Sequence, residues 1–346
     1  AMIGDHCISA ISDAYCKGIR NFDVDKAYEG MRKNAFEVPS NPDEYKNGMG
    51  RRALASYLEY GYIPLEDGVP DAFHTKEQVS RTLEYAYDDF ALAQMAKALG
   101  KTDDYQALIQ RAANYRNVID SRTGYAQGRH ADGTFLNDAN AFNFARFITE
   151  GAPCHYTWYV PQDPYGLMDC MGGKDKYVAK LDSMFSEHRY WHGNEPCHQV
   201  AYMFNYAGEP WKTQRAVRHI METEYLNEPG GLSGNDDAGQ MSAWYMFAAM
   251  GFYPVCPGTP YYLLASPSFP SFTLNLENGN TFTVKARNAS QKNIYIQSAT
   301  LNGKPYTRNY ITHQDIVNGG VMEFVMGDEP NKEWGAGAEN CPPEVM

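Results

Sequence analysis

Apolar residues recur with a helical period from the start of the chain to about residue 255. The longest such segment, residues 76–99, places Val79, Leu83, Ala86 and Phe90 on one stripe. Polar turns of uneven length join ten segments of this kind, which favours a toroid of helical hairpins over a four-helix bundle. The predicted helices cover residues 8–16, 23–36, 51–60, 76–99, 105–118, 163–171, 175–188, 196–206, 211–225 and 240–250.

The pattern changes after residue 258. Apolar and polar residues then alternate with a period of two, and Asn and Gly turns separate the alternating stretches. We therefore predict a helical domain over residues 1–258 and a small antiparallel β unit over 259–346, with the boundary near 258–265. The predicted strands are residues 272–276, 281–284, 294–296 and 321–325.

Length, charge and cysteine usage exclude several classes of protein. The 346 residues exceed what one core usually supports, so a large unit and a smaller one are expected. A net charge of −12 argues against nucleic acid and anionic membranes as partners, because both need a cationic surface. No apolar run approaches the ~18 residues of a membrane span. The seven cysteines form no C-x-x-C pair, which argues against a zinc site or a disulfide framework.

Two turns rich in oxygen-bearing side chains precede helical segments. We name residues 193–196 (Gly-Asn-Glu-Pro) the Asn194 turn and residues 234–237 (Gly-Asn-Asp-Asp) the Asn235 turn. Carboxylates and carboxamides in such turns can bind a hard cation, orient a sugar or move a proton. Their oxygens suit Ca²⁺ better than zinc, and the histidines of this region lack the H-x-x-x-H and H-E-x-x-H spacings of zinc sites.

The acids of these turns also have an ordinary structural explanation. Glu195 precedes Pro196, so it can cap a helix or serve a function, and the sequence favours neither. One of Asp236 and Asp237 can cap the helix that begins at Gln240. Two adjacent acids beside an asparagine exceed what a cap needs, which favours a function for this pair.

Further acids lie outside the two turns. Glu150 ends a helix-like run over 142–149, where the helix dipole disfavours a carboxylate and so favours a protonated acid. Asp88 and Asp89 lie within the 76–99 helix, most simply on a solvated face, with inward-facing acids as the alternative. Glycoside hydrolysis needs a pair of carboxyls facing each other across a bond, and these positions supply candidates. No P-loop, dinucleotide-binding or G-x-S-x-G motif is present.

Several long motifs in this chain resemble glycoside hydrolase family 92, a family of α-mannosidases. The resemblance covers nearly the whole chain, and His192-Gly193-Asn194-Glu195-Pro196 is its most specific part. The motifs that carry it are residues 2–6, 82–89, 156–158, 192–196, 206–214, 234–244 and 293–303, in this order.

The resemblance implies an exo-acting, Ca²⁺-dependent, inverting glycosidase with an N-terminal β-sandwich packed on an (α/α)6 barrel. Glu150 matches the general acid and Asp237 the general base, so their carboxyls are expected roughly 6.5–9.5 Å apart. The implied metal ligands are Asn194, Glu195 and Asn235. The implied substrate-binding residues are Asp236, His192, Asp5 and His6.

Two departures from the family pattern affect what is expected. Residues 151–155 are Gly-Ala-Pro-Cys-His where the family usually has Gly-Asn-Ala-Trp-Gln, which leaves the linkage preference open. The chain also begins inside the barrel, so we expect a toroid that is incomplete at its N-terminal side. Its expected partners are an α-mannoside glycan and the missing N-terminal portion of the enzyme. By resemblance, the compartment is secreted, periplasmic or cell-surface.

Three other interpretations stay open. A non-catalytic glycan-binding protein would keep the pocket and lose the acid or the base, whereas Glu150 and Asp237 are both present. An inactive fragment would need a companion chain to complete the barrel. A protein-interaction domain on a helical toroid would need neither the Asn194 turn nor the Asn235 turn. The sequence therefore favours an α-mannosidase.

Overall fold

Two units share the chain in an interleaved way. The computed structural model describes residues 3–41, 43, 50–70, 72, 74–137 and 140–346. Unit 1 runs to Tyr177 and includes Cys256–Thr259 and Val345–Met346, and unit 2 comprises Val178–Val255 and Pro260–Glu344. Each unit is described separately below.

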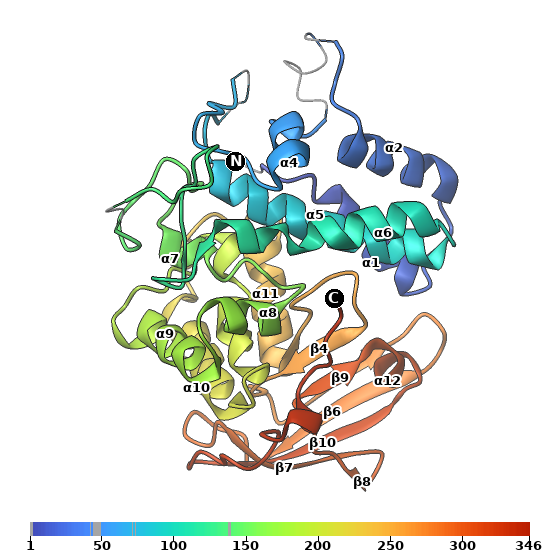
Figure 1. The fold of residues 1–346 in the computed structure, drawn as a ribbon. Helices are drawn as coiled ribbons and strands as arrows, with labels where there is room; N and C mark the ends of the chain where they lie inside the picture. Colours follow the sequence, from blue (N-terminus) through green and yellow to red (C-terminus); the bar gives the residue numbers. More distant parts are fainter. Residues whose placement is uncertain (1–2, 42, 44–49, 71, 73, 138–139) are drawn as a thin grey trace. The chain divides into compact units, whose positions relative to one another are not determined.

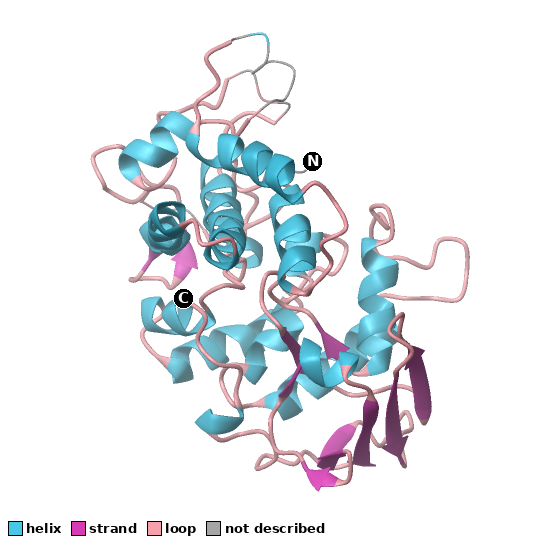
Figure 2. Cartoon of the chain, turned by 90° about the vertical axis from the view of Figure 1, so that its right-hand side faces the viewer, coloured by secondary structure: helices cyan, strands magenta, loops and turns pink. Residues whose placement is uncertain are grey.

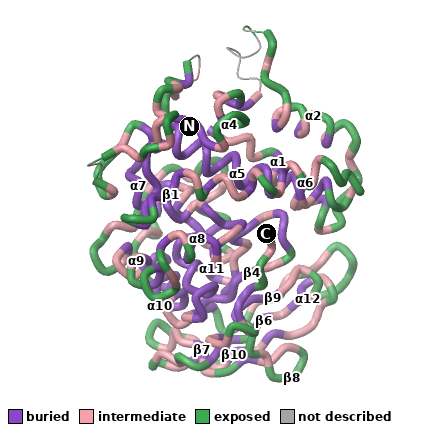
Figure 3. The backbone as a smooth tube through the Cα atoms, in the orientation of Figure 1, coloured by how far each residue is buried: buried purple, intermediate pink, exposed green. Residues whose placement is uncertain are grey.

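Helix α5 (Gln78–Ala98) is the central helix of unit 1 (Figure 1). The sequence predicts a single apolar stripe, yet nearly every residue of α5 is buried (Figure 3). The reason is that α1, α2, α6 and the 3₁₀ helix η1 all pack against it, and a helix enclosed on all sides buries polar positions too. The enclosing helices are α1 (Cys7–Cys16), α2 (Val24–Phe36), α6 (Thr102–Arg111) and η1 (Ala112–Val118).

The remaining elements of unit 1 are short. The predicted helix over 105–118 is α-helical only as far as Arg111 and tightens into η1 beyond it. A β1–β2 hairpin follows directly, and its strands pair antiparallel. The short elements are α4 (Leu54–Tyr60), β1 (Ile119–Asp120), β2 (Tyr125–Ala126), α7 (Pro153–Tyr156) and α8 (Pro164–Cys170).

Helices α10 and α11 of unit 2 contact strands that follow them in the chain. The helix predicted over 196–206 is instead two 3₁₀ helices, η2 (Glu195–Cys197) and η3 (Val200–Asn205). All residues of η3 are buried, so tertiary packing outweighs the local preference for an α-helix there. The α-helices are α9 (Lys174–Ser186), whose first residues belong to unit 1, α10 (Pro210–Thr223) and α11 (Gln240–Met250).

Two sheets make up the strand-rich part of unit 2 (Figure 2). The order of the larger sheet is β5-β6-β10-β7-β8, and that of the smaller is β3-β4-β9. The strands are β3 (Phe252–Tyr253), β4 (Tyr261–Leu264), β5 (Ser271–Asn275), β6 (Thr281–Arg287), β7 (Tyr295–Leu301), β8 (Lys304–Pro305), β9 (Tyr310–Thr312) and β10 (Gly320–Gly327), with α12 (His313–Val317) after β9.

The predicted alternation of side chains is present in these strands. Phe282 and Val284 of β6 and Met322 and Phe324 of β10 point into one core, while their neighbours are more exposed. The pairing differs from the prediction at one place, because β6 and β10 run parallel while the other pairs are antiparallel. Strands β6 and β10 are separated along the chain by β7, β8, β9 and α12, and this long connection permits parallel pairing.

Helical segments followed by a small, mainly antiparallel sheet region thus match the predicted fold class. The toroid itself stays a prediction. The predicted division at residue 258 also stays a prediction. The two structural units are not separated by a single cut in the sequence, because Cys256–Thr259 belongs to unit 1 while its flanking residues belong to unit 2.

Candidate functional site

The Asn194 turn and the Asn235 turn meet through their backbones in unit 2. A Cβ atom on Gly234 would lie 2.4 Å from the carbonyl oxygen of Gly193, and one on Gly193 would lie 2.6 Å from that of Ser233. Both positions therefore require glycine, because any other residue would push the two turns apart. The contact brings together the backbones of two turns that lie about forty positions apart in the sequence.

Asp237 begins a run of three residues in the left-handed conformation. The φ angles are 47° for Asp237, 59° for Ala238 and 103° for Gly239. For a residue other than glycine this conformation costs roughly 1–2 kcal/mol. Such strain persists only where the surrounding contacts enforce it, and it concentrates at functional sites. The backbone therefore marks Asp237 independently of its side-chain chemistry.

Asp236 has a structural role in the same turn. Its Oδ1 accepts hydrogen bonds from the backbone N–H and the hydroxyl of Ser242, both at 2.9 Å. Ser242 lies in the first turn of α11, so this carboxylate caps the helix although Gly239 occupies the N-cap position. If a substrate contacts Asp236 as predicted, it shares this carboxylate with the helix cap.

A chain of hydrogen bonds includes His192, the residue before the Asn194 turn. The Tyr190 hydroxyl and His192 Nδ1 are 2.7 Å apart, and His192 Nε2 and the Tyr225 hydroxyl are 2.6 Å apart. The Tyr225 hydroxyl in turn donates to the carbonyl oxygen of Met241 at 2.9 Å. A carbonyl can only accept, so Tyr225 receives its bond from His192 Nε2–H, and His192 Nδ1 accepts from Tyr190.

His192 is therefore a supporting residue in this structure. Its side chain is fully buried, and both ring nitrogens are engaged in the chain just described. Burial lowers the pKa of His192 to about 3, with His198 adding to the effect, so the ring is neutral. The predicted direct contact between His192 and a substrate is not supported, because no ring nitrogen is left to offer.

His198 belongs to the same network as His192. Its Nε2–H donates to the carbonyl oxygen of His192 at 3.1 Å, and its Nδ1 lies 3.3 Å from Gln240 Nε2. The two imidazoles stack with centroids 4.6 Å apart. Burial lowers the pKa of His198 to about 4, while its bond to His192 and the charge of Asp237 act in the opposite direction.

The predicted metal ligands differ in their burial. Asn194 is buried, Glu195 is half-buried and Asn235 is exposed. The side-chain nitrogen of Asn194 is buried without a hydrogen-bond partner among the described residues, and turning the amide over would present its oxygen there instead. No cluster of three or more His, Cys, Asp or Glu side chains suited to a metal occurs in the described part of the chain. The donor set is therefore dominated by amide oxygens, which fits Ca²⁺ and does not fit zinc.

Glu150 lies in unit 1, in a segment that is not helical. The predicted run over 142–149 forms turns, because the carbonyls of Arg146 and Phe147 accept the N–H groups of Glu77, Val79 and Ser80 at the start of α5. The helix-dipole argument for a protonated Glu150 therefore does not apply. Glu150 is exposed, with φ of 50°, so it shares the left-handed conformation found at Asp237.

His6 occupies the centre of an acidic cluster in the same unit. Its Nδ1 lies 2.9 Å from Asp88 Oδ1, and its Nε2 lies 3.1 Å from Glu84 Oε2. Tyr156 donates to the other oxygen of Glu84 at 2.9 Å. Burial acts to lower the pKa of His6, but the charge of Asp88 and the two hydrogen bonds raise it well above its ordinary value. His6 is therefore cationic at neutral pH.

Asp5 and Asp89 are tied together by a buried arginine. Arg51 donates to Asp5 Oδ1 at 3.1 Å and to Asp89 Oδ1 at 2.6 Å. Arg111 adds a bond of 2.7 Å to the same oxygen of Asp89. Asp88 and Asp89 are fully buried, so the alternative of inward-facing acids is correct and the solvated face is wrong. Burial raises the pKa of Asp5, against the charge of Arg51.

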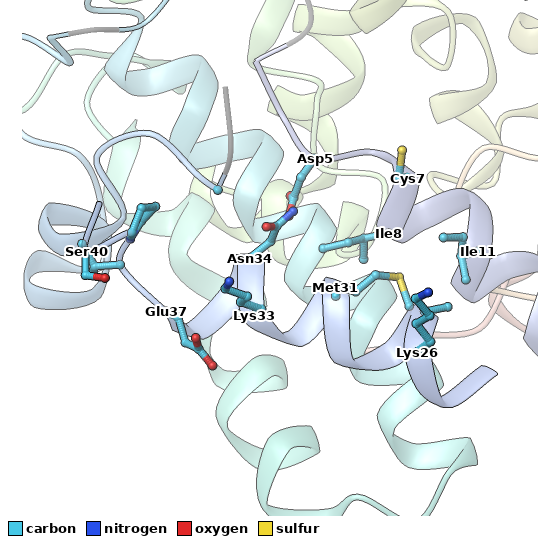
Figure 4. A pocket seen from close by; sticks show the side chains of 15 residues that line it. Asp5, Cys7, Ile8, Ile11, Lys26, Met31, Lys33, Asn34, Glu37 and Ser40 are labelled. Atoms are coloured by element: carbon cyan, nitrogen blue, oxygen red, sulfur yellow. The ribbon is translucent and has the colours of Figure 1, made fainter. Parts of the chain in front are cut away.

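A groove of about 640 Å³ is lined by residues of α1 and α2, and Asp5 is one of its lining residues (Figure 4). Ile8, Ile11 and Met31 contribute apolar side chains to its lining, and Lys26 and Glu37 contribute charged ones. Of the predicted site residues, only Asp5 lines this groove.

The structure thus brings together two groups of predicted residues, each within one unit. Unit 1 joins Asp5 to His6 through Asp88, which accepts both the backbone N–H of Asp5 and the ring of His6. Unit 2 joins the two turns above His192. Glu84 is a partner of His6 that the sequence did not predict, although the spacing of Glu84 and Asp88 places them on one face of α5. Tyr225 was not predicted either, because the sequence carries no signal for its role.

Known relatives match this chain along its length. The glycosyl hydrolase family 92 catalytic domain, as a family model, matches residues 1–328. A curated relative, an uncharacterized secreted glycosidase of Arthroderma benhamiae, is 33% identical over 375 residues, which cover 99% of this chain and 47% of the relative. In the described residues, no helix is long and apolar enough to cross a membrane.

Solved structures are similar over the same extent. A family 92 α-mannosidase of Bacteroides thetaiotaomicron has 41% sequence identity and a TM-score of 0.91, and the match covers 100% of this chain and 45% of that one. The same mannosidase in complex with mannoimidazole gives a TM-score of 0.90 at 40% identity, covering 100% and 46% of the two chains. A family 92 inverting mannosidase of that species has 36% identity and a TM-score of 0.90, covering 99% and 48%. The chain therefore spans about half the length of these relatives.

Proposed function

Because the chain belongs to glycosyl hydrolase family 92, we propose that it carries out the exo-acting hydrolysis of α-linked mannosides in glycans. The observation that carries this proposal is the backbone contact between the Asn194 turn and the Asn235 turn, because Asp237 belongs to one of the two turns and Asn194 and Glu195 belong to the other. Three of the similar structures belong to mannosidases, one of them bound to mannoimidazole, which supports the substrate class.

Glu150 is the proposed general acid and Asp237 the proposed general base. The acid protonates the glycosidic oxygen, and the base takes a proton from the water that attacks the anomeric carbon on the opposite face, which inverts its configuration. One relative is described as an inverting mannosidase, and both residues stand on strained backbone, as functional residues often do.

The sugar is proposed to be bound by Asp5, His6 and Asp236. In unit 1, a cationic His6 held by Glu84 and Asp88 and an Arg51-bound Asp5 form a rigid polar surface that can hold hydroxyl groups. His192 is left out of this set, because its side chain is buried and both of its ring nitrogens are hydrogen-bonded within the protein.

Ca²⁺ is the proposed cofactor, with Asn194, Glu195 and Asn235 as its ligands. Among the described residues, the buried side-chain nitrogen of Asn194 has no hydrogen-bond partner, so the amide can turn its oxygen to that side, and the amide-rich donor set favours Ca²⁺. When bound, Ca²⁺ would orient and polarise mannose hydroxyls. An (α/α)6 barrel as the setting of this site, and a location outside the cytoplasm, are proposed on the similarity to a relative named a secreted glycosidase and to the solved mannosidases.

Replacing each proposed catalytic residue in the full chain of the protein tests these roles. Glu150→Gln should lower kcat on a defined α-linked mannobiose by about 10²–10⁴-fold. It should lower kcat much less on an aryl α-mannoside, whose leaving group needs no proton. Asp237→Ala should lower kcat by a similar factor on both substrates, and azide should restore turnover by attacking the anomeric carbon in place of the activated water, yielding β-mannosyl azide.

The matched control is Glu29→Gln, which changes an exposed glutamate on α2 and should leave both activities unchanged. Full activity in Glu150→Gln or Asp237→Ala would refute the assignment. Binding of mannosides without any turnover in the wild type would instead favour a glycan-binding protein. Turnover that survives EDTA, with no gain on added Ca²⁺, would refute the cofactor.

A further inference from the structure

Tyr225 contacts the chain immediately beside both turns of the site. Its hydroxyl is bonded to His192, the residue before the Asn194 turn. Its backbone pairs with Leu232 in an isolated antiparallel bridge, two residues before the Asn235 turn. It also donates to the carbonyl oxygen of Met241, in the first turn of the helix that follows. One side chain and its backbone therefore reach three segments that frame the site.

The ring of Tyr225 is held in place as firmly as its hydroxyl. It stacks parallel on Trp244, with centroids 5.9 Å apart and an angle of 4° between the planes. The ring of Tyr245 packs against that of Tyr225, with centroids 4.9 Å apart. A phenol fixed by two rings and two hydrogen bonds has few alternative positions, so the segments bonded to it are fixed relative to each other.

The Asn235 turn needs such a restraint. Asp237 and Ala238 both adopt the left-handed conformation, and each costs roughly as much as one or two net hydrogen bonds provide. The turn would relax if the contacts around it were weakened. Tyr225 bonds to Met241, two residues after this left-handed run, and its bond to His192 connects it to the residue before the Asn194 turn.

We propose that Tyr225 is a positioning residue that holds the Asn235 turn, and with it the carboxylate of Asp237, in register with the Asn194 turn. This inference rests on the proposed function, because it assigns Tyr225 a part in placing the general base. Tyr225 acts through His192 and Met241 and touches no reacting atom. The bonds that matter are those of its hydroxyl, since the ring packing would survive without it.

Tyr225→Phe removes only that hydroxyl, and the chain offers a matched control. Tyr202 is fully buried, and its ring centroid lies 6.3 Å from that of Trp244. Its hydroxyl has no hydrogen-bond partner within the described residues. Tyr202→Phe therefore makes the same chemical change without breaking a bond. Both variants would be assayed in the full chain of the protein with a defined α-mannoside.

Tyr225→Phe should lower kcat by about 10–100-fold, the usual effect of losing a partner that orients functional ligands. KM should stay within about twofold, because the position of the base matters only in the transition state. Tyr202→Phe should keep both constants. Equal kcat in the two variants would overturn the proposal, and so would a loss in Tyr225→Phe that appears in KM alone.

Amide hydrogen exchange supplies a readout that does not depend on hydrolysis. Exchange across residues 234–241 should be about two- to tenfold faster in Tyr225→Phe than in Tyr202→Phe, the ratio expected for one net hydrogen bond. A wild type without mannosidase activity would refute the proposed function, and the exchange comparison would then decide the positioning role alone. Equal exchange in both variants would overturn it.

Tyr190→Phe is the second variant, used if circular dichroism shows that Tyr225→Phe does not fold. It removes the donor to His192 Nδ1 and leaves Tyr225 in place. Faster exchange at residues 234–241 and a lower kcat are expected, both smaller than for Tyr225→Phe. Values equal to those of Tyr202→Phe would overturn the proposal.

Discussion

Two buried polar networks of opposite kind support the proposed site, one in each unit. In unit 1, the buried carboxyls of Asp88 and Asp89 are bonded to the basic side chains of His6, Arg51 and Arg111. In unit 2, His192 and His198 are buried as neutral rings among tyrosine hydroxyls and carbonyl oxygens. Both networks order side chains that carry chemistry, but they depend on different forces.

The difference lies in what happens when one member is lost. Removing one partner of a buried ion pair leaves an uncompensated charge in a low-dielectric interior. Removing a hydroxyl from a neutral network leaves one unsatisfied polar group, which costs less. The charged network should therefore dominate stability, while the neutral one tunes position. The following predictions test this contrast, beginning with the largest effect.

Asp89→Ala should destabilise unit 1 by about 3–5 kcal/mol, because Arg51 and Arg111 both lose a buried carboxylate. Urea titration, followed by hydrogen exchange in peptides from α5, measures the change. Asp103→Ala, an exposed aspartate in the first turn of α6, is the control and should have a small effect. Equal effects in the two variants would show that the buried network does not carry the stability of unit 1.

Acid should weaken unit 2 through its histidines. The pKa values of His192 and His198, lowered to about 3 and about 4, mean that the unfolded chain binds more protons below pH 6.5. Their stabilising contribution is therefore present above pH 6.5 and is lost as the pH falls. Between pH 6.5 and 5 each should account for about 1.5 kcal/mol. Exchange in peptides from η3 and α11, corrected for its intrinsic pH dependence, should rise; unchanged protection would contradict a neutral network.

Alkali should weaken unit 1 through His6. The pKa of His6 is raised, chiefly by Asp88, so its contribution is fully present below pH 6.5 and is lost as the pH rises through the raised value. Exchange in peptides from α1 and α5 should therefore increase on the alkaline side. His6→Gln should flatten this dependence, and an unaltered slope in that variant would assign the effect to other groups.

Ala238→Gly should have the smallest effect and the opposite sign. Glycine adopts the left-handed conformation without strain, so unit 2 should gain up to about 1 kcal/mol. Ala243→Gly, the same change in the exposed interior of α11, should lose about 0.5–1 kcal/mol. A loss of stability in both variants would show that the left-handed run is not strained.

Local patterns predicted most of the elements. The helical period located α1, α2, α8, α10 and α11 within a few residues, and the alternation of side chains located the strands β5, β6, β7 and β10. The helix predicted over 142–149 was wrong, because its carbonyls bond to the start of α5, some seventy positions earlier. Contacts between distant segments leave no local period in the sequence.

The same limit applies to the candidate site. The identity of the acids and the two Gly-bounded turns were visible, because turn residues and adjacent carboxylates are local features. The burial of Asp88 and Asp89 was not, since Asp89 is held by Arg51 and Arg111, 38 and 22 positions away. Tyr225 was invisible too, because its bonds to His192 and Met241 exist only in the fold.

Proton NMR of the first product tests the central claim most directly. With an α-linked mannobiose and the full chain of the protein, a water activated by Asp237 should release mannose as the β-anomer, before mutarotation forms the α-anomer. Release of α-mannose first would contradict this role for Asp237, and an absence of released mannose would contradict the proposed substrate class.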